Sequence, residues 1–246
     1  WRLHRAGRRR EVMVVAGVFA LAGAGYLFGH LRWYGSLTVY ATGQHFAETG
    51  EFSVMGVTPN FATRTSRLIG LLVDRRFGLA AWQPAWLLMI PALAWLARKR
   101  PAGWEVLALP LAAGWLSATY LALTMHGWWW PGRQVVVVLP AAVLAICIWA
   151  GSARGVWLTT ALGVVGMFNL AWLFVQGRRA QLTMVVDFFD TTNPVYRGWS
   201  RLLPDYIVLS TGDWVLHAIW VAVAFFLILQ GRRRPPVTSE APSLPV

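Results

Sequence analysis

Charged residues and cysteine are scarce in this sequence. The first shortage argues against a soluble domain, and the second excludes intrachain cysteine cross-links and multi-cysteine metal sites. Charged side chains make up 13% of the chain, whereas a soluble domain carries about 25%. Cys147 is the only cysteine, which excludes an intrachain disulfide and a Cys-x-x-Cys metal site within the sequence. We interpret this thiol as a packing group inside an apolar run. The shortage of charge indicates a chain that folds in an apolar environment.

Apolar side chains take the place of the missing charge. The chain is 57% hydrophobic, contains 16 Trp and has a mean hydropathy of +0.51. Its net charge of +12 could point to a nucleic-acid partner, but the basic residues do not share one soluble face. They stand in short clusters between long apolar runs, as the cytoplasmic anchors of membrane proteins do. We therefore predict a membrane protein with no nucleic-acid partner.

Six apolar runs separate the basic clusters, and each is near the length that crosses about 30 Å of hydrocarbon as a helix. They are residues 12–31, 79–97, 104–124, 135–150, 156–176 and 214–230. A helix is required because every backbone polar group must be satisfied within the lipid. The sequence therefore predicts an all-α fold, a polytopic transmembrane helical bundle of about six spans. The transmembrane domain would cover residues 1–234.

Three details of these segments modify the picture. The fourth run opens with β-branched residues 135–138, which would favour a strand in a soluble protein but which we predict to be helical here. Prolines inside the runs are expected to kink their helices. These prolines are Pro84, Pro91, Pro110 and Pro140. The segment 235–246 is rich in Pro and Ser, and we predict a disordered cytoplasmic tail there.

The start of the chain resembles a signal peptide, because a basic stretch precedes an apolar one. The apolar run is about 20 residues long and no clear cleavage site follows it, so we interpret it as the first span. The first residue is Trp1 and not Met, from which we expect that an upstream portion belongs to the protein.

Basic density predicts the orientation. Residues 1–11, 98–103, 151–155 and 231–246 hold 12 Arg or Lys in 38 positions. Residues 32–78, 125–134 and 177–213 hold 10 in 94 positions. The first set is therefore predicted to be cytoplasmic, with both termini inside. Seven of the ten acids then lie on the outer side, namely Glu48, Glu51, Asp74, Asp187, Asp190, Asp205 and Asp213.

Two outer loops are long, and long loops with polar chemistry are often functional. Within residues 32–78 lies a short apolar stretch, and we predict that about Thr65 to Val73 forms a helix lying at the membrane interface. Nine residues of helix reach about 14 Å, half of the hydrocarbon thickness, so this stretch is too short to be a span. The aromatic residues of the loop 177–213 indicate that it is ordered.

The outer segment His126-Gly-Trp-Trp-Trp-Pro-Gly-Arg133 is the sharpest local motif. One interpretation is an aromatic belt at the membrane edge, which needs no ligand. The other is a substrate-binding site, in which Arg133 holds a phosphate by two parallel hydrogen bonds beneath an aromatic wall. That wall would include Trp129 and Trp130, with His126 beside them.

The segment Asp74-Arg-Arg-Phe-Gly78 is the second motif. It is either an interfacial charge cluster, with Asp74 paired to a neighbouring arginine, or a contact to an anionic lipid headgroup that involves Asp74 and Arg75. The orientation rule depletes arginine on the outer side, so the arginines found there need an anionic partner. These arginines include Arg64, Arg67, Arg75, Arg76, Arg133, Arg197 and Arg201.

Polar residues inside the spans are few. We expect Asn169 and His217 to bond across helices. No zinc-protease, Walker, nucleophile-elbow or Cys/His motif is present in the sequence, and no row of acids suggests a proton relay. The sequence therefore predicts neither a metal site nor a cofactor.

Four stretches, in this order, resemble landmarks of the bacterial GT-C membrane glycosyltransferases, which use polyprenyl-phosphate-linked sugars. They are Arg32-Trp-Tyr-Gly-Ser-Leu37, the stretch from Gly70 to Leu79 with Trp82-Gln-Pro-Ala-Trp-Leu-Leu88, the stretch from His126 to Pro140, and Leu202-Leu-Pro-Asp-Tyr206. Together they cover about residues 32 to 206. Members of that family normally have more than six spans, and their proposed catalytic carboxylate lies in the outer loop after the first span. The resemblance implies that this chain is the C-terminal half of such an enzyme, with its carboxylate upstream.

The resemblance also implies partners and site residues. The partners would be a polyprenyl-phosphate-linked sugar, membrane lipids and a missing N-terminal half or partner subunit, in the bacterial inner membrane of the cell envelope. Arg133, and less closely Asp74 and Arg75, match landmark positions, although Val73-Asp74 stands where the family usually has Phe-Ser. The rival hypothesis is a non-catalytic polytopic membrane protein that binds a partner or an anionic lipid. A transporter is disfavoured, because charged residues within the spans and internal repeats are missing.

Overall fold

A computed structural model describes most of the chain and divides it into two compact units. The described residues are 7–35, 61–122, 125, 132–183 and 187–233. Unit 1 is Trp1–Asn60 and unit 2 is Phe61–Val246. All regular secondary structure in the described ranges is helical, with no strand, which confirms the predicted all-α class. The predicted tail at 235–246 lies outside the described residues.

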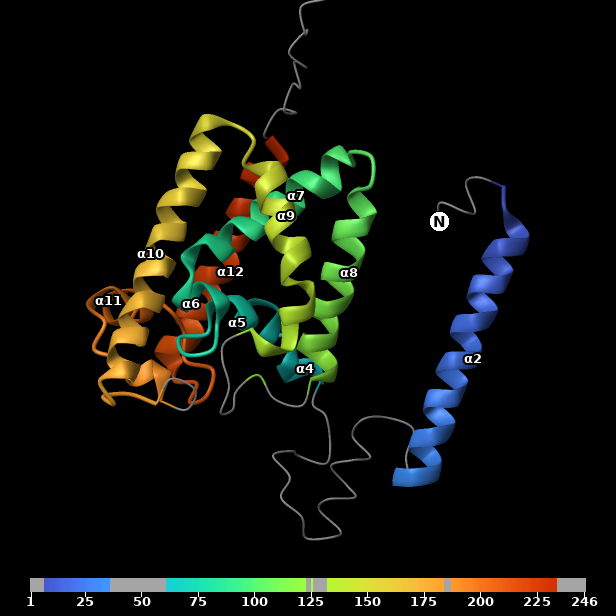
Figure 1. Ribbon diagram of the computed structural model, residues 1–246, viewed down its shortest axis with the longest axis horizontal. Coiled ribbons are helices and arrows are strands. Elements are labelled where there is room, and N and C mark those ends of the chain that lie inside the picture. Colours follow the sequence, from blue (N-terminus) through green and yellow to red (C-terminus); the bar gives the residue numbers. More distant parts are fainter. Residues whose placement is uncertain (1–6, 36–60, 123–124, 126–131, 184–186, 234–246) are drawn as a thin grey trace, which may run out of the picture. The chain divides into compact units, whose positions relative to one another are not determined.

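The described part of unit 1 consists mainly of one long helix, α2 (Arg9–Tyr34) (Figure 1). It contains the first predicted span, and none of its residues is buried. The helix ends at Gly35, which adopts a φ of 72° while its N–H donates to the carbonyl of Leu31 over 3.1 Å. Glycine adopts this left-handed conformation without the steric cost that a Cβ brings. The apolar surface of α2 is suited to lipid.

Unit 2 contains the remaining helices, and several of them pack closely. In chain order they are α4 (Phe61–Arg64), α5 (Arg67–Val73), α6 (Leu79–Trp82), η1 (Pro84–Leu88), α7 (Met89–Lys99), α8 (Trp104–Leu116), η2 (Ser117–Leu121), η3 (Arg133–Val138), α9 (Leu139–Trp149), α10 (Ala153–Arg178), η4 (Phe188–Asp190), α11 (Pro194–Ser200) and α12 (Thr211–Arg233). α7 packs against α12 and α9, and α8 packs against α9. α10 contacts η1, α6 and α11.

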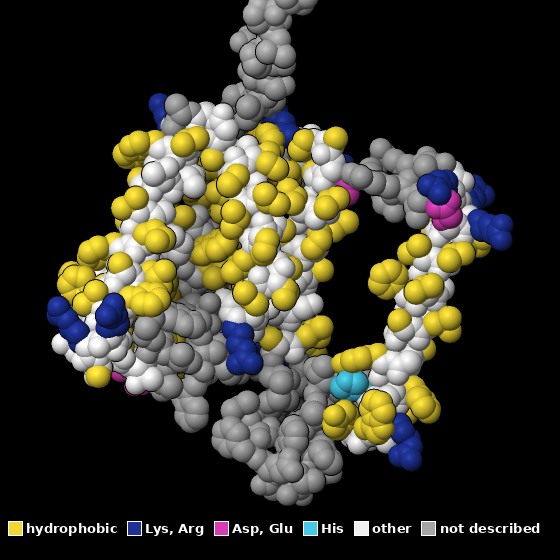
Figure 2. Space-filling view, viewed as in Figure 1, with side chains coloured by type: hydrophobic (Ala, Val, Ile, Leu, Met, Phe, Trp, Pro, Cys, Tyr) yellow, Lys and Arg dark blue, Asp and Glu magenta, His cyan; other side chains and the backbone are white. Residues whose placement is uncertain are grey.

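Three helices in the described ranges are long and apolar enough to cross a membrane. They are α2, the part of α10 from Arg154 to Arg178, and the part of α12 from Thr211 to Arg232. Apolar side chains also cover much of the visible surface of unit 2 (Figure 2). A soluble protein rarely exposes apolar surface on this scale. The chain therefore has the character of a membrane protein, as its composition predicted.

The three other predicted spans are helical but divided, so a count of six stays a prediction. The second run consists of α6, η1 and α7, and the fourth begins with 3₁₀ turns in η3, not with the strand that β-branched residues favour in water. Pro84 and Pro140 stand in the first turn of η1 and α9, where the missing N–H of proline is tolerated. They open new helical segments, whereas Pro110 lies inside α8.

The loops of unit 2 gather at two ends (Figure 1). At one end Arg98, Arg100 and Arg232 line a common pocket. At the other end, the Arg64 guanidinium donates to the carbonyl of Tyr120 over 2.6 Å, so α4 meets the end of α8 and η2. The predicted alternation of loops across a membrane stays a prediction. Which end faces the cytoplasm stays a prediction.

The predicted short helix before Asp74 is present as α5. Its seven residues reach about 10 Å, which is too short for a span. Its second half, from Gly70 to Val73, is buried against the rest of unit 2. The position of α5 relative to a membrane interface stays a prediction.

Candidate functional site

The predicted Asp74 motif forms a tight turn in the centre of the loop end of unit 2. We call residues 74–78 the Asp74 turn. The Asp74 side chain is 0% exposed. Its Oδ1 accepts the N–H groups of Arg76 over 2.8 Å and Phe77 over 2.6 Å, and its Oδ2 accepts the N–H of Tyr206 over 3.1 Å. The carboxylate thus fixes its own turn and joins it to the loop before α12.

Gly78 closes this turn because its N–H donates to the Asp74 carbonyl over 2.9 Å. A Cβ added at Gly78 would lie 2.4 Å from the Asp74 nitrogen and 2.8 Å from the Leu72 oxygen. These are backbone atoms that a small side-chain movement does not clear.

We expect Gly78→Ala to lower the free energy of unfolding by about 1–3 kcal/mol, the usual cost of overpacking. Thermal or denaturant unfolding of the purified protein in detergent measures this loss. Gly198→Ala in α11 is the matched control, because nothing lies within 4 Å of its added Cβ. Equal stability of the two variants would show that the Asp74 turn tolerates a side chain at Gly78.

Two arginines of the turn meet two buried aspartates, Asp205 in the loop before α12 and Asp213 in the first turn of α12. Arg76 Nη2 lies 3.0 Å from Asp205 Oδ2, and Arg75 Nη2 lies 3.4 Å from Asp213 Oδ1. Arg75 Nε also donates to the carbonyls of Ser200 and Leu203, each over 3.1 Å. A charge cluster is therefore present, in which Asp205 and Asp213 are acidic partners of Arg76 and Arg75. The predicted pairing of Asp74 with a neighbouring arginine side chain, and the position of the cluster at a membrane interface, stay predictions.

Asp205 and Asp213 also bind backbone groups, so their carboxylates shape the loop. Asp213 Oδ1 accepts the Asp205 N–H over 2.9 Å, and Asp213 Oδ2 accepts the Ser210 N–H over 3.0 Å. Asp205 Oδ1 accepts the Ile207 N–H over 3.0 Å. These carboxylates have protein donors on both oxygens. A substrate-binding role for Asp74 and Arg75 stays a prediction, since both side chains hold this loop together.

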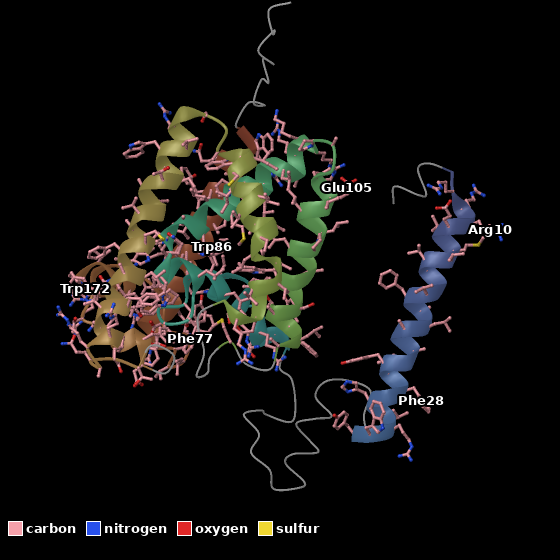
Figure 3. All side chains as sticks on the ribbon, viewed as in Figure 1. Arg10, Phe28, Phe77, Trp86, Glu105 and Trp172 are labelled. Carbon is pink, nitrogen blue, oxygen red and sulfur yellow. The ribbon has the colours of Figure 1, made fainter. Side chains whose placement is uncertain are left out.

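Aromatic residues surround the Asp74 turn. Phe77 lies at the loop end (Figure 3) and packs edge-on against Phe188, with ring centroids 5.5 Å apart. Tyr196 stacks on Trp82 with centroids 4.0 Å apart, and its hydroxyl donates to the Arg75 carbonyl over 2.9 Å. Burial, followed by the negative charge of Asp74, raises the pKa of Tyr196. The phenol therefore stays protonated at neutral pH and keeps its role as a donor.

Buried amide side chains form hydrogen bonds between α10 and its neighbouring segments. Asn169 Nδ2 donates to the Trp82 carbonyl over 2.9 Å, and Asn169 Oδ1 accepts from Asn193 Nδ2 over 2.9 Å. The expected bonding of Asn169 across helices is confirmed, because Trp82 belongs to α6. His217 instead bonds to the loop before α12, where the Tyr206 hydroxyl lies 2.6 Å from its Nδ1. Sequence reasoning overlooked Asn193, although its place before the first proline of α11 marks it as a helix cap.

Arg133 begins η3 and its side chain is exposed. The preceding Gly132 has a φ of 81°, and a Cβ there would lie 2.4 Å from Leu79 Cδ2. The backbone immediately before Arg133 is therefore specified by glycine. His126, Trp129 and Trp130 lie outside the described residues, so the predicted aromatic wall stays a prediction.

An apolar cavity of about 450 Å³ is the second feature of unit 2. Helices α5, α7, α8 and α12 line it with residues that include Leu72, Leu93, Ala112 and Ile228. Its one indole N–H, on Trp115, donates to the Leu68 carbonyl over 3.0 Å. The cavity is therefore suited to an aliphatic chain and offers little to a polar ligand.

The described residues contain no cluster of three or more His, Cys, Asp or Glu side chains placed to hold a metal ion. What they bring together is an apolar cavity and a loop end rich in arginine. Comparison of the chain with protein-family models, with curated proteins and with solved structures finds no match.

Proposed function

We propose that this chain is the membrane part of an enzyme that transfers a sugar from a polyprenyl-phosphate donor to an acceptor outside the cytoplasm. The apolar cavity of about 450 Å³ carries the proposal. A polyprenyl chain is aliphatic, and burying each of its carbons in such a cavity is favourable by about 0.8 kcal/mol per CH₂. The resemblance of four sequence stretches to the GT-C glycosyltransferases supports the choice of donor.

The cavity has a suitable shape for a chain. Its wall on α8 extends from Ala108 to Leu116, a helical rise of about 12 Å. On α7 the wall extends from Met89 to Ala97, so the cavity follows two helices along much of their length. A long aliphatic ligand satisfies this wall better than a compact one.

Arginines stand where the cavity meets the loop end. Arg67 immediately precedes the lining residue Leu68, and its Nη1 donates to the Ala122 carbonyl over 2.8 Å. Arg64 is held in the same way by Tyr120. A guanidinium has five N–H donors, so one that donates to a carbonyl can also bind a phosphate. With Arg133, these side chains provide charge that would stabilise the departing polyprenyl phosphate.

The chemistry that we propose is attack of an acceptor hydroxyl on the anomeric carbon of the sugar. The carbon–oxygen bond to the polyprenyl phosphate breaks, and the phosphate leaves with the bonding electron pair. A carboxylate would accept the hydroxyl proton. We place this reaction at the bacterial inner membrane, with six spans and both termini in the cytoplasm, which the distribution of basic residues supports. The protein partner that we propose is a further membrane segment or a second membrane subunit.

A non-catalytic lipid-binding protein is the second candidate, and one observation favours it. Asp74, Asp205 and Asp213 have protein donors on their carboxylate oxygens, as described above. Of the described acids at this end, Asp190 is exposed and Asp187 is half-buried. A catalytic base would therefore be Asp190, Asp187 or a residue outside the described ranges. Sugar transfer distinguishes the two candidates, because both bind a lipid and only one turns it over.

Filling the cavity tests the binding step. Ala112 lines the cavity and is exposed, so Ala112→Phe places a ring in the cavity without compressing a packed core. We expect the affinity for a photoreactive polyprenyl phosphate to fall by about tenfold, equivalent to 1.4 kcal/mol. Photolabelling at graded ligand concentrations measures the affinity. Val106→Phe on the same helix is the control, because Val106 is 61% exposed and does not line the cavity. Equal labelling of both variants would exclude the cavity as the chain site.

A further inference from the structure

A pocket of about 430 Å³ lies at the loop end of α10, and neither the Asp74 turn nor the apolar cavity contributes to its lining. One side of α10 provides most of the lining, with Phe168, Trp172, Gln176 and Arg179. These positions recur at three- and four-residue intervals and so share one face of the helix. The loop that follows adds Gln181 and Thr192. Figure 3 shows Trp172 beside α10 near this loop end.

The polar side of the pocket presents donors. Thr192 Oγ1 accepts from Gln176 Nε2 over 3.1 Å and from Trp172 Nε1 over 3.4 Å. With two donors directed at its oxygen, the hydroxyl has its own proton left to give. Gln176 Oε1 already accepts the Thr191 hydroxyl and the Thr192 N–H. The buried Gln176 therefore orients Thr192 and leaves the pocket a hydroxyl donor.

Arg179 and Gln181 add further donors. Within the part of the chain that the structure describes, their side chains form no hydrogen bond and Arg179 forms no ion pair. The backbone around Arg179 and Gln181 has a defined, hydrogen-bonded conformation. The N–H of Gln181 donates to the Gln176 carbonyl and that of Ala180 to the Gly177 carbonyl, each over 3.0 Å, while Ala180 has a φ of 51°. This left-handed helix end fixes the direction in which the chain leaves α10.

The other side of the pocket is apolar and belongs to a membrane span. Phe168 and Trp172 lie with ring centroids 5.6 Å apart, on the part of α10 that is long and apolar enough to cross a membrane. From Phe168 to Arg179 the wall extends about 16 Å along the helix. It changes from aromatic and aliphatic side chains to a guanidinium and an amide. A ligand with an oxyanion attached to an aliphatic chain contacts the polar and the apolar part of this wall with matching groups.

We propose that this pocket binds an anionic phospholipid, with the phosphodiester held by Arg179, Gln181 and the Thr192 hydroxyl. The lining contains no carboxylate, so the positive charge of Arg179 is matched by the ligand and not by the wall. The acyl chain lies along Phe168 and Trp172. This site does not depend on the proposed sugar transfer. The alternative is an arginine that reaches the headgroup region without a specific partner.

Lipid retention by the full chain tests the site. The protein is reconstituted in nanodiscs of phosphatidylcholine with a minor fraction of photoreactive phosphatidylglycerol, and the cross-linked lipid is quantified and mapped by mass spectrometry. We expect labelling at residues of the pocket. We expect Arg179→Gln to reduce it by about tenfold, because a hydrogen bond to a charged group is lost. The matched control is Arg178→Gln, which removes the neighbouring exposed charge outside the pocket lining.

Three outcomes would overturn the proposal. The first is equal labelling of the Arg179 and Arg178 variants, which indicates general attraction to a basic helix end. The second is equal labelling by photoreactive phosphatidylcholine, which indicates no preference for an anionic headgroup. The third is loss of labelling when inorganic phosphate is present before irradiation at the same concentration as the photoreactive lipid, which indicates a site for the free anion. Each result is independent of polyprenyl-phosphate labelling at the apolar cavity, so failure here leaves the proposed function standing.

Discussion

Asp74→Ala is expected to lower the free energy of unfolding by at least about 3 kcal/mol, because three backbone N–H groups lose their acceptor and each unsatisfied donor costs about 1–3 kcal/mol. The carboxylate is fully buried and binds the N–H groups of Arg76, Phe77 and Tyr206. Loss of the carboxylate therefore opens the Asp74 turn and also removes the contact to Tyr206 in the loop before α12. Thermal unfolding in detergent, followed by the tryptophan signal, measures the change.

Two further variants serve as controls for Asp74→Ala. Asp74→Asn keeps a carbonyl oxygen that can accept the Arg76 and Phe77 N–H groups, so it should lose less stability than Asp74→Ala. Asp190→Ala removes an exposed carboxylate and should change stability by no more than about 0.5 kcal/mol. If Asp74→Ala unfolds within about 1 kcal/mol of the wild type, the Asp74 turn does not organise this end of the protein.

Under the proposed function, loss of nearly all sugar transfer is the expected result of Arg133→Ala, with folding and membrane insertion retained. A charge-assisted hydrogen bond contributes about 1.5–3 kcal/mol, so transfer should fall at least about tenfold. Arg133 is exposed at the start of η3, and its side chain is not part of the packed core. The measurement is the rate of transfer from a lipid-linked sugar donor, normalised to the amount of protein in the membrane.

Arg133→Lys separates a phosphate clamp from a general positive charge. Lysine keeps the charge but lacks the planar fork that binds a phosphate with two parallel hydrogen bonds. We expect this variant to lose much of the activity. An arginine that only reaches toward lipid headgroups would be replaced by lysine without loss. Wild-type turnover in Arg133→Lys would therefore contradict the clamp.

The positions of the helices were predictable from apolar run length, because the hydrocarbon of a membrane sets that length. α2, α10 and α12 follow this rule with few interruptions. The break of the second run at Pro84 agrees with the kink expected there, whereas the separate 3₁₀ segment η1 between α6 and α7 was not predictable from run length. The division of this run depends on local hydrogen bonding around Gln83, whose side chain accepts the Ala85 N–H over 3.4 Å at the start of η1.

The candidate site was predictable in part. Charge at positions 74–76 indicated a cluster, and the structure contains one. The acidic partners Asp205 and Asp213 are more than a hundred residues away, and run length and residue type do not indicate which distant acids meet an arginine. The apolar cavity could not be predicted from the sequence either, because four helices that are separated along the chain form its wall. The donor set around Thr192 likewise depends on a rotamer held by Gln176.

The most direct test of the proposed function is sugar transfer by the full-length protein in bacterial membrane vesicles, with a polyprenyl-phosphate donor that carries a labelled sugar. We predict label in an acceptor on the non-cytoplasmic side, release of polyprenyl phosphate in equal amount, and loss of both in Arg133→Ala vesicles. Binding of the donor without release of polyprenyl phosphate, at a level unaffected by Arg133→Ala, would contradict the proposal and favour a non-catalytic lipid-binding protein.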